Sequence, residues 1–154
     1  MSAVLEIRAQ PVAASGRLLL EHIAGLLRLR AVPKSEVALA ETARNGLSPQ
    51  ALKHLASVGM RPDDLAFIIP ARTLSHRIAK GERLTVEESD RALRLARIVA
   101  IALIAFGEQA KALEWLAAPK KQFGGASALA MVRTEAGARL VEELLTRVDE
   151  GYFA

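Results

Sequence analysis

The stretch RTLSHRIAKGERLTVEESDRALRLARI, residues 72–98, has the pattern of two helices and the residues that separate them. Gly81 is expected to end the first helix, because glycine readily adopts the left-handed conformation that follows many helix C-termini. Thr85 and Glu88 form the pattern of a capping box, in which each side chain bonds a backbone N–H at a helix start. This box predicts a long second helix that runs to Phe106, where Gly107 ends it.

The segments on both sides of this stretch also have helical spacing. Apolar residues three and four positions apart, with caps and breakers between them, predict helices over residues 17–29, 35–44, 48–59, 62–69 and 108–118. Thr134 is expected to cap a last helix. No stretch sustains the apolar–polar alternation of a half-buried strand. The sequence therefore predicts an all-α fold.

Composition limits the class of protein. The 154 residues include no cysteine, which excludes disulfides and thiolate metal sites. The longest apolar run, residues 98–106, is far shorter than the roughly 20 residues that span a bilayer. The first ten residues lack the continuous apolar region of a signal peptide. These features predict a cytoplasmic protein that makes no membrane contact.

Charge is unevenly distributed along the chain. Residues 134–154 hold two of the 21 basic and five of the 17 acidic residues, so this end is net −3 and the remainder is net +7. A basic body is typical of proteins that bind polyanions. The acidic end indicates a different task.

The layout of helix, tight break and second helix, with the second helix rich in basic and hydroxyl side chains, is typical of a helix-turn-helix. Leu74 and Ile78 are four residues apart and are expected to face the core. The outward-facing candidates for DNA binding are Arg72, Thr73, Ser75, His76, Arg77, Lys80 and Arg83. The alternative is an ordinary solvated helix.

A second basic stripe, Arg91, Arg94 and Arg97, has a more ordinary explanation. Glu87 lies four residues before Arg91, and Asp90 lies four before Arg94, so both arginines have acidic partners at helical spacing.

No pattern of catalytic or metal-binding residues stands out. His22, His54 and His76 are scattered and lack the spacing of metal ligands. Gly124 and Gly125 do not follow a strand, so they do not form a phosphate-binding loop. We therefore expect no catalytic centre, no metal and no cofactor.

The motifs as a set resemble a known family. Residues 72–98, followed by FG, KALEWL, a proline, GG and TEAGARLVEELLTRVDEG, resemble the Xre/ParS/MbcA antitoxins of RES–Xre type II toxin–antitoxin systems. The resemblance covers Ser48–Ala154, about two thirds of the chain. One departure is that Ser127-Ala128 stand where the family usually has Thr-Pro, which is expected to loosen that helix start without abolishing the fold.

The resemblance implies an antitoxin built from two helical parts. Residues 47–95 would form an Xre-like helix-turn-helix that dimerises, binds operator DNA and represses its own operon. Residues 96–154 would form a small toxin-binding domain, and residues 1–46 match no landmark. The partner would be a cognate RES-domain toxin that degrades NAD. Among the matching landmarks, we expect Phe106, Trp115 and Leu116 to be core residues and Gly137 to allow close helix packing.

The resemblance also implies that the C-terminal end is inserted toward the toxin's active site, which would place toxin binding on Gly151, Tyr152, Phe153 and Ala154. Burying two aromatic side chains yields roughly 10 kcal/mol gross. Ordering four residues costs roughly 6 kcal/mol, so a surplus near 4 kcal/mol remains. Alternatively, both rings fold back onto the protein's own core. At the level of the whole chain, the alternative is a stand-alone transcription regulator whose C-terminal half only dimerises.

Overall fold

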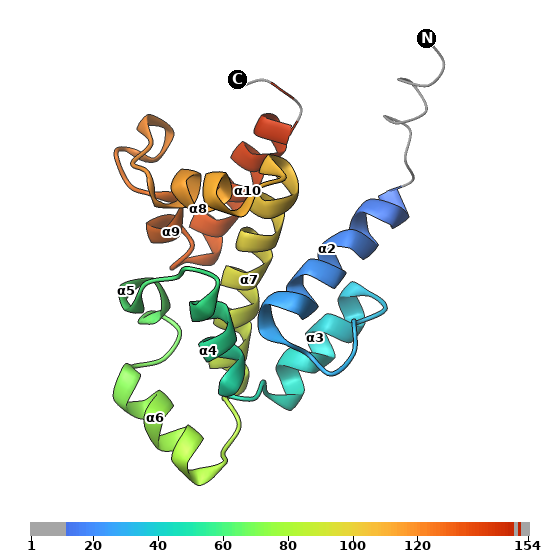
Figure 1. Ribbon diagram of the computed structural model, residues 1–154, viewed down its shortest axis with the longest axis vertical. Helices are drawn as coiled ribbons and strands as arrows, with labels where there is room; N and C mark the ends of the chain where they lie inside the picture. The colour runs from blue at the N-terminus through green and yellow to red at the C-terminus, as the bar shows by residue number, and fades with distance from the viewer. Residues whose placement is uncertain (1–11, 150, 152–154) are drawn as a thin grey trace.

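The computed structural model describes residues 12–149 and 151, and every regular element in this part of the chain is helical (Figure 1). This confirms the all-α prediction. The elements are α2 (Val12–Leu27), α3 (Glu36–Asn45), α4 (Gln50–Ser57), α5 (Pro62–Leu65), α6 (Ala71–Lys80), α7 (Val86–Phe106), α8 (Gln109–Ala117), the short 3₁₀ helix η1 (Lys121–Phe123), α9 (Ala128–Met131) and α10 (Glu135–Asp149). No helix in the described ranges has the length and apolar character needed to cross a bilayer.

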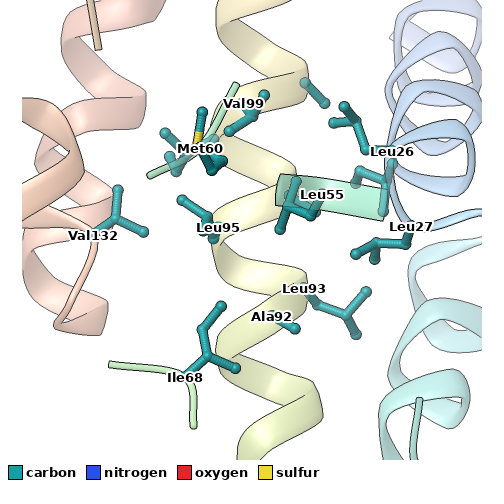
Figure 2. Packing of buried hydrophobic residues seen from close by; sticks show 14 of the residues in the cluster. Leu26, Leu27, Leu55, Met60, Ile68, Ala92, Leu93, Leu95, Val99 and Val132 are labelled. Atoms are coloured by element: carbon teal, nitrogen blue, oxygen red, sulfur yellow. The ribbon is translucent and has the colours of Figure 1, made fainter. Parts of the chain in front are cut away.

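The 21-residue helix α7 is the axis of the fold. It contacts α2 and α3 on one side and α8 and α10 on the other, as Figure 1 shows. Its buried face carries small and branched residues, including Leu95, Ile98 and Val99, which are 0–1% exposed. In Figure 2, Leu26, Leu27 and Leu55 pack on one side of α7, and Ile68 and Val132 lie on the other. Helix α7 thus supplies apolar surface to both halves of the molecule.

Both halves of the chain belong to one hydrophobic core. The same cluster of buried side chains extends from Leu20 and Ile23 in α2 to Val141 and Leu145 in α10. The domain boundary proposed between residues 95 and 96 falls inside α7. A substitution that disturbs α7 is therefore expected to affect both parts of the fold.

The local signals around α7 are confirmed. The backbone N–H of Thr85 donates to Oε1 of Glu88 at 2.8 Å, and the N–H of Glu88 donates to Oγ1 of Thr85 at 3.1 Å. Gly81 and Gly107 end α6 and α7 in the left-handed conformation, with φ of 67° and 69°. These contacts satisfy backbone groups that a helix end would otherwise leave unpaired.

The end of α2 differs from its prediction. The helix stops at Leu27 rather than Leu29, because Arg28 adopts a left-handed backbone with φ of 49°. The N–H of Leu29 then donates to the carbonyl of Ala24 at 2.9 Å, which closes the helix end. Glycine is the residue usually found in this position, so an arginine here is unusual.

Candidate nucleic-acid interface

Helix α6 lies on the outside of the molecule, at the end of Figure 1 opposite the C-terminal end of α10. It contains no fully buried residue. Leu74 is half-buried and packs against the core, as its spacing predicts, and Ile78 is also half-buried. Pro70 precedes the first turn and Gly81 follows the last, so both ends of this exposed helix are fixed by backbone chemistry.

Most of the predicted DNA-binding side chains lie on the accessible surface of this region. Arg72, Ser75, His76, Lys80 and Arg83 are exposed, and Thr73 is half-buried. Nη1 of Arg83 donates to the carbonyl of Gly46 at 2.8 Å, which ties the segment after α6 to the segment before α4. The exposed set provides three cations and two polar side chains from one short helix and its following loop, a composition suited to phosphate and base-edge contacts.

Arg77 does not face outward, so its predicted orientation is wrong. Nη2 of Arg77 forms an ion pair with Oε1 of Glu88 at 3.2 Å, and Nη1 donates to the carbonyl of Arg83 at 3.0 Å. The side chains of Arg77 and Glu88 are only 19% and 11% exposed. Glu88 is also the capping residue of α7. Arg77 therefore holds α6 against the start of α7.

This geometry predicts that Arg77→Ala acts on stability. Removing the guanidinium leaves the largely buried Glu88 carboxylate without its ion-pair partner and is expected to cost about 2 kcal/mol of unfolding free energy. Thermal unfolding followed by circular dichroism measures this loss. The matched variant Arg72→Ala removes an exposed arginine from the same helix and is expected to leave the melting temperature unchanged. Equal melting temperatures for both variants would contradict the structural role of Arg77.

The second arginine stripe is part of the scaffold. Arg94 pairs with Asp90 at 3.7 Å, as predicted. Arg91 does not use Glu87; its Nη1 donates instead to the carbonyl of Ile68 at 2.8 Å. Arg97 forms an ion pair with Glu36 of α3. The stripe thus joins α7 to α3 and to the segment before α6.

The C-terminal half confirms the predicted structural roles of its landmarks in part. Leu116 is fully buried, whereas Phe106 and Trp115 are half-buried and contact each other, with ring centroids 5.8 Å apart. Nζ of Lys120 lies 4.1 Å from the centroid of the Trp115 ring, and burial lowers the pKa of this ammonium below its ordinary value. These residues anchor the turn that follows α8.

The helix that begins after Ser127 forms without the proline, and Gly137 has the close contact that was expected. Oγ of Ser127 accepts from the N–H of Ala130 at 3.1 Å, so the start of α9 is capped although no proline follows Ser127. A Cβ added to Gly137 would lie 2.0 Å from the carbonyl oxygen of Met131, which confirms that this glycine permits close packing. Helix α10 can approach α9 only because position 137 carries no side chain.

The predicted toxin-binding tail falls mostly outside the described residues. Gly151 is exposed, with φ of 83°, and its N–H donates to the carbonyl of Val148 at 3.0 Å. Tyr152, Phe153 and Ala154 lie beyond the part that the structure describes. Among the described residues, no three His, Asp or Glu side chains form a group that could hold a metal ion.

Comparison with known proteins reveals two adjacent family matches. Residues 38–97 match the antitoxin Xre-like helix-turn-helix domain, and residues 102–151 match the antitoxin Xre/MbcA/ParS C-terminal toxin-binding domain. The first match covers α4 to α6 and most of α3 and α7, and the second begins near the end of α7 and includes α10.

Relatives support the same assignment. The chain is 48% identical to an "Antitoxin Xre" of Pseudomonas putida over 85 residues, which are 55% of this chain and 54% of that protein. It is 37% identical to an "Antitoxin Xre" of Yersinia enterocolitica over 87 residues, which are 56% of this chain and 59% of that protein. The chain thus spans little more than half the length of the curated relatives that it matches. With two successive family matches and relatives of the same kind, the chain belongs to the Xre/MbcA/ParS antitoxin family.

Proposed function

We propose that this chain is an antitoxin that binds and neutralises a cognate RES-domain toxin, which degrades NAD, and that it represses its own operon. The observation that carries the first part is the match of residues 102–151 to a toxin-binding domain. The chain acts by binding rather than by catalysis. It acts in the cytoplasm, where both proposed partners, the toxin and the operator DNA, are found. Residues 47–95 serve DNA binding and residues 96–154 serve toxin binding.

Neutralisation rests on residues Gly151–Ala154 reaching the toxin. Helix α10 holds Gly151 at an exposed position, and the left-handed backbone of this glycine allows the following residues to leave the helix direction. Two aromatic rings on such a segment suit a pocket that binds a dinucleotide, because both rings can stack against apolar walls and exclude the substrate.

Repression rests on α6 and its surroundings. Arg72, Thr73, Ser75, His76, Lys80 and Arg83 provide the contacts to operator DNA, while Arg77 fixes the helix that presents them. The chain acts as a homodimer. In such a dimer, two helix-turn-helix units can bind two half-sites of a palindromic operator that lie one turn of DNA apart.

Co-expression tests the proposal. We expect the toxin to be encoded in the reading frame next to the gene for this chain, and its expression alone to deplete cellular NAD and stop growth. Expression of this chain with the toxin is expected to restore both. NAD assayed in cell extracts, together with colony counts, gives the result. Continued NAD loss in the presence of equimolar soluble antitoxin would contradict neutralisation.

Rescue from the toxin, rather than DNA binding, distinguishes an antitoxin from a stand-alone regulator. Both functions predict that the chain binds a duplex from upstream of its own gene, but only the antitoxin also rescues cells from the toxin. Arg72→Ala is expected to weaken DNA binding about tenfold, the lower end of the effect of losing a base-contacting arginine, without changing NAD rescue. Loss of both activities in this variant would point to a folding defect instead.

A further inference from the structure

A basic cavity lies beside the candidate DNA-binding helix, between the loop after α2, the end of α3 and the start of α4. Its volume is about 690 Å³, and its lining includes Arg28, Arg30 and Arg83. No carboxylate side chain lines it in the part of the chain that the structure describes. A cavity with three guanidinium groups and no acidic group has a positive potential that suits a phosphate.

The three arginines of this cavity form no ion pair with a carboxylate in the described part of the chain. None of the ion pairs formed within residues 12–149 includes Arg28, Arg30 or Arg83, and all three are exposed. This distinguishes them from Arg77, Arg94 and Arg97, each of which has a carboxylate partner. Their positive charge is therefore available to a ligand in solution.

The backbone around the cavity adds a second positive element. Ser48, which precedes α4, and Ala51, in its first turn, also line the cavity. The first turn of α4 contains no acidic residue that would offset the positive end of the helix dipole. An anion in the cavity would thus lie near a helix N-terminus as well as three guanidinium groups.

Arg28 occupies its place at a conformational cost. Its φ of 49° lies in the left-handed region, where glycine is unstrained and an arginine is disfavoured. Glycine would close α2 with the same hydrogen bonds, since the bonded groups belong to the backbone. Stability alone therefore does not explain an arginine at this position.

The cavity is physically joined to the helix that is proposed to read DNA. Arg83 follows α6 and donates to the carbonyl of Gly46 beside the cavity, and the N–H of Leu84 donates to the carbonyl of Leu47 at 2.9 Å. In Figure 1, the loop before α7 and the end of α3 lie at the same end of the molecule as α6. A duplex in contact with α6 can thus place its backbone near the cavity.

We propose that Arg28, Arg30 and Arg83 form a second contact to operator DNA, in which the cavity receives a backbone phosphate next to the bases that α6 reads. Arg28 and Arg30 precede the region that matches the helix-turn-helix family, which starts at residue 38. The inference rests on the proposed DNA-binding function. The cavity would add affinity for DNA of any sequence, whereas α6 would provide the preference for the operator sequence.

Salt dependence tests the inference. The probe is a duplex from upstream of the chain's own gene, together with an unrelated duplex of equal length, and binding is measured over a range of salt concentrations. Replacing Arg28 by glycine and Arg30 by alanine removes the phosphate contact of the cavity from each protomer, and so two phosphate contacts from the proposed homodimer. The slope of log K against log salt is therefore expected to flatten by about 1.8. A fourfold rise in salt then weakens the wild-type protein about 12-fold more than it weakens the variant.

The substitutions separate binding from folding. Arg28→Gly relieves the left-handed strain and is expected to raise the melting temperature by about 3 °C. Arg30→Ala alone is expected to flatten the slope by about half as much as the double variant does. This substitution does not change a residue with a left-handed backbone, so its effect reports the loss of charge. A matched double variant, Arg139→Ala with Arg147→Ala, removes two exposed arginines from α10 and is expected to keep the wild-type slope.

The outcomes distinguish this inference from the proposed function on which it rests. Wild-type protein that fails to bind either duplex would overturn DNA binding itself. Wild-type protein that binds with a steep slope, together with an Arg30→Ala variant of equal slope, would overturn only the cavity contact. Loss of affinity for the upstream duplex but not for the unrelated one would also overturn it, because a phosphate contact acts on both.

Discussion

Gly137→Ala is expected to destabilise the protein by about 3 kcal/mol, because the new methyl group would overlap backbone rather than a movable side chain. The added Cβ would lie 2.0 Å from the carbonyl oxygen and 2.9 Å from the carbonyl carbon of Met131. Helices α9 and α10 would have to separate, and α10 carries the buried residues Val141, Leu144 and Leu145. Chemical denaturation followed by circular dichroism measures the change.

Gly25→Ala is the matched control for this substitution. Gly25 also lies inside a helix, but apart from its chain neighbours and the adjacent backbone of its own helix, nothing lies within 4 Å of the place that its new methyl group would take. Alanine has the higher helix propensity, so this variant is expected to be more stable by about 0.8 kcal/mol. Opposite signs for the two glycine variants would confirm the packing explanation, whereas similar effects would contradict it.

Replacing both Tyr152 and Phe153 by serine is expected to abolish toxin neutralisation. The surplus of about 4 kcal/mol from burying the two rings corresponds to a roughly 1,000-fold loss of affinity for the toxin. Binding to purified toxin, measured by calorimetry, and NAD rescue in co-expressing cells report the effect. Operator binding is expected to remain at the wild-type level, because the substituted residues are far along the chain from α6.

Val37→Ser provides the control for loss of apolar surface. Val37 lies on α3 and is 71% exposed, so its replacement removes a surface hydrophobic residue outside both the proposed tail contact and α6. This variant is expected to neutralise the toxin fully. Full neutralisation by the Tyr152 and Phe153 variant as well would reject the tail as an anchor and favour packing of both rings on their own core.

The features that could be predicted from the sequence act over short distances along the chain. The box formed by Thr85 and Glu88 joins residues three positions apart, and Gly81 and Gly107 act through their own backbone. Their chemistry is therefore visible in a few letters of sequence. Helical spacing likewise identified Leu74 as the residue that packs α6 against the core.

The sequence could not predict the hydrogen-bond or ion-pair partner of each arginine. Arg77 pairs with a carboxylate 11 residues away, and Arg91 prefers the carbonyl of Ile68 to a glutamate one turn away on its own helix. Both choices depend on how α6 and its preceding segment pack on α7. Arg28 and Arg83 line one cavity only after the loops around α3 fold together, so no local pattern marks that cavity.

The shared helix α7 has a consequence for the lifetime of the protein in the cell. Because one core joins α2 to α10, an unfolding event in either half exposes segments of both to a protease. A partner that binds only the folded C-terminal half would lower the population of this open form, and so would also protect the half that contains α6. We therefore expect a partner bound at the C-terminal end of α7 to slow the degradation of the segments at its N-terminal end.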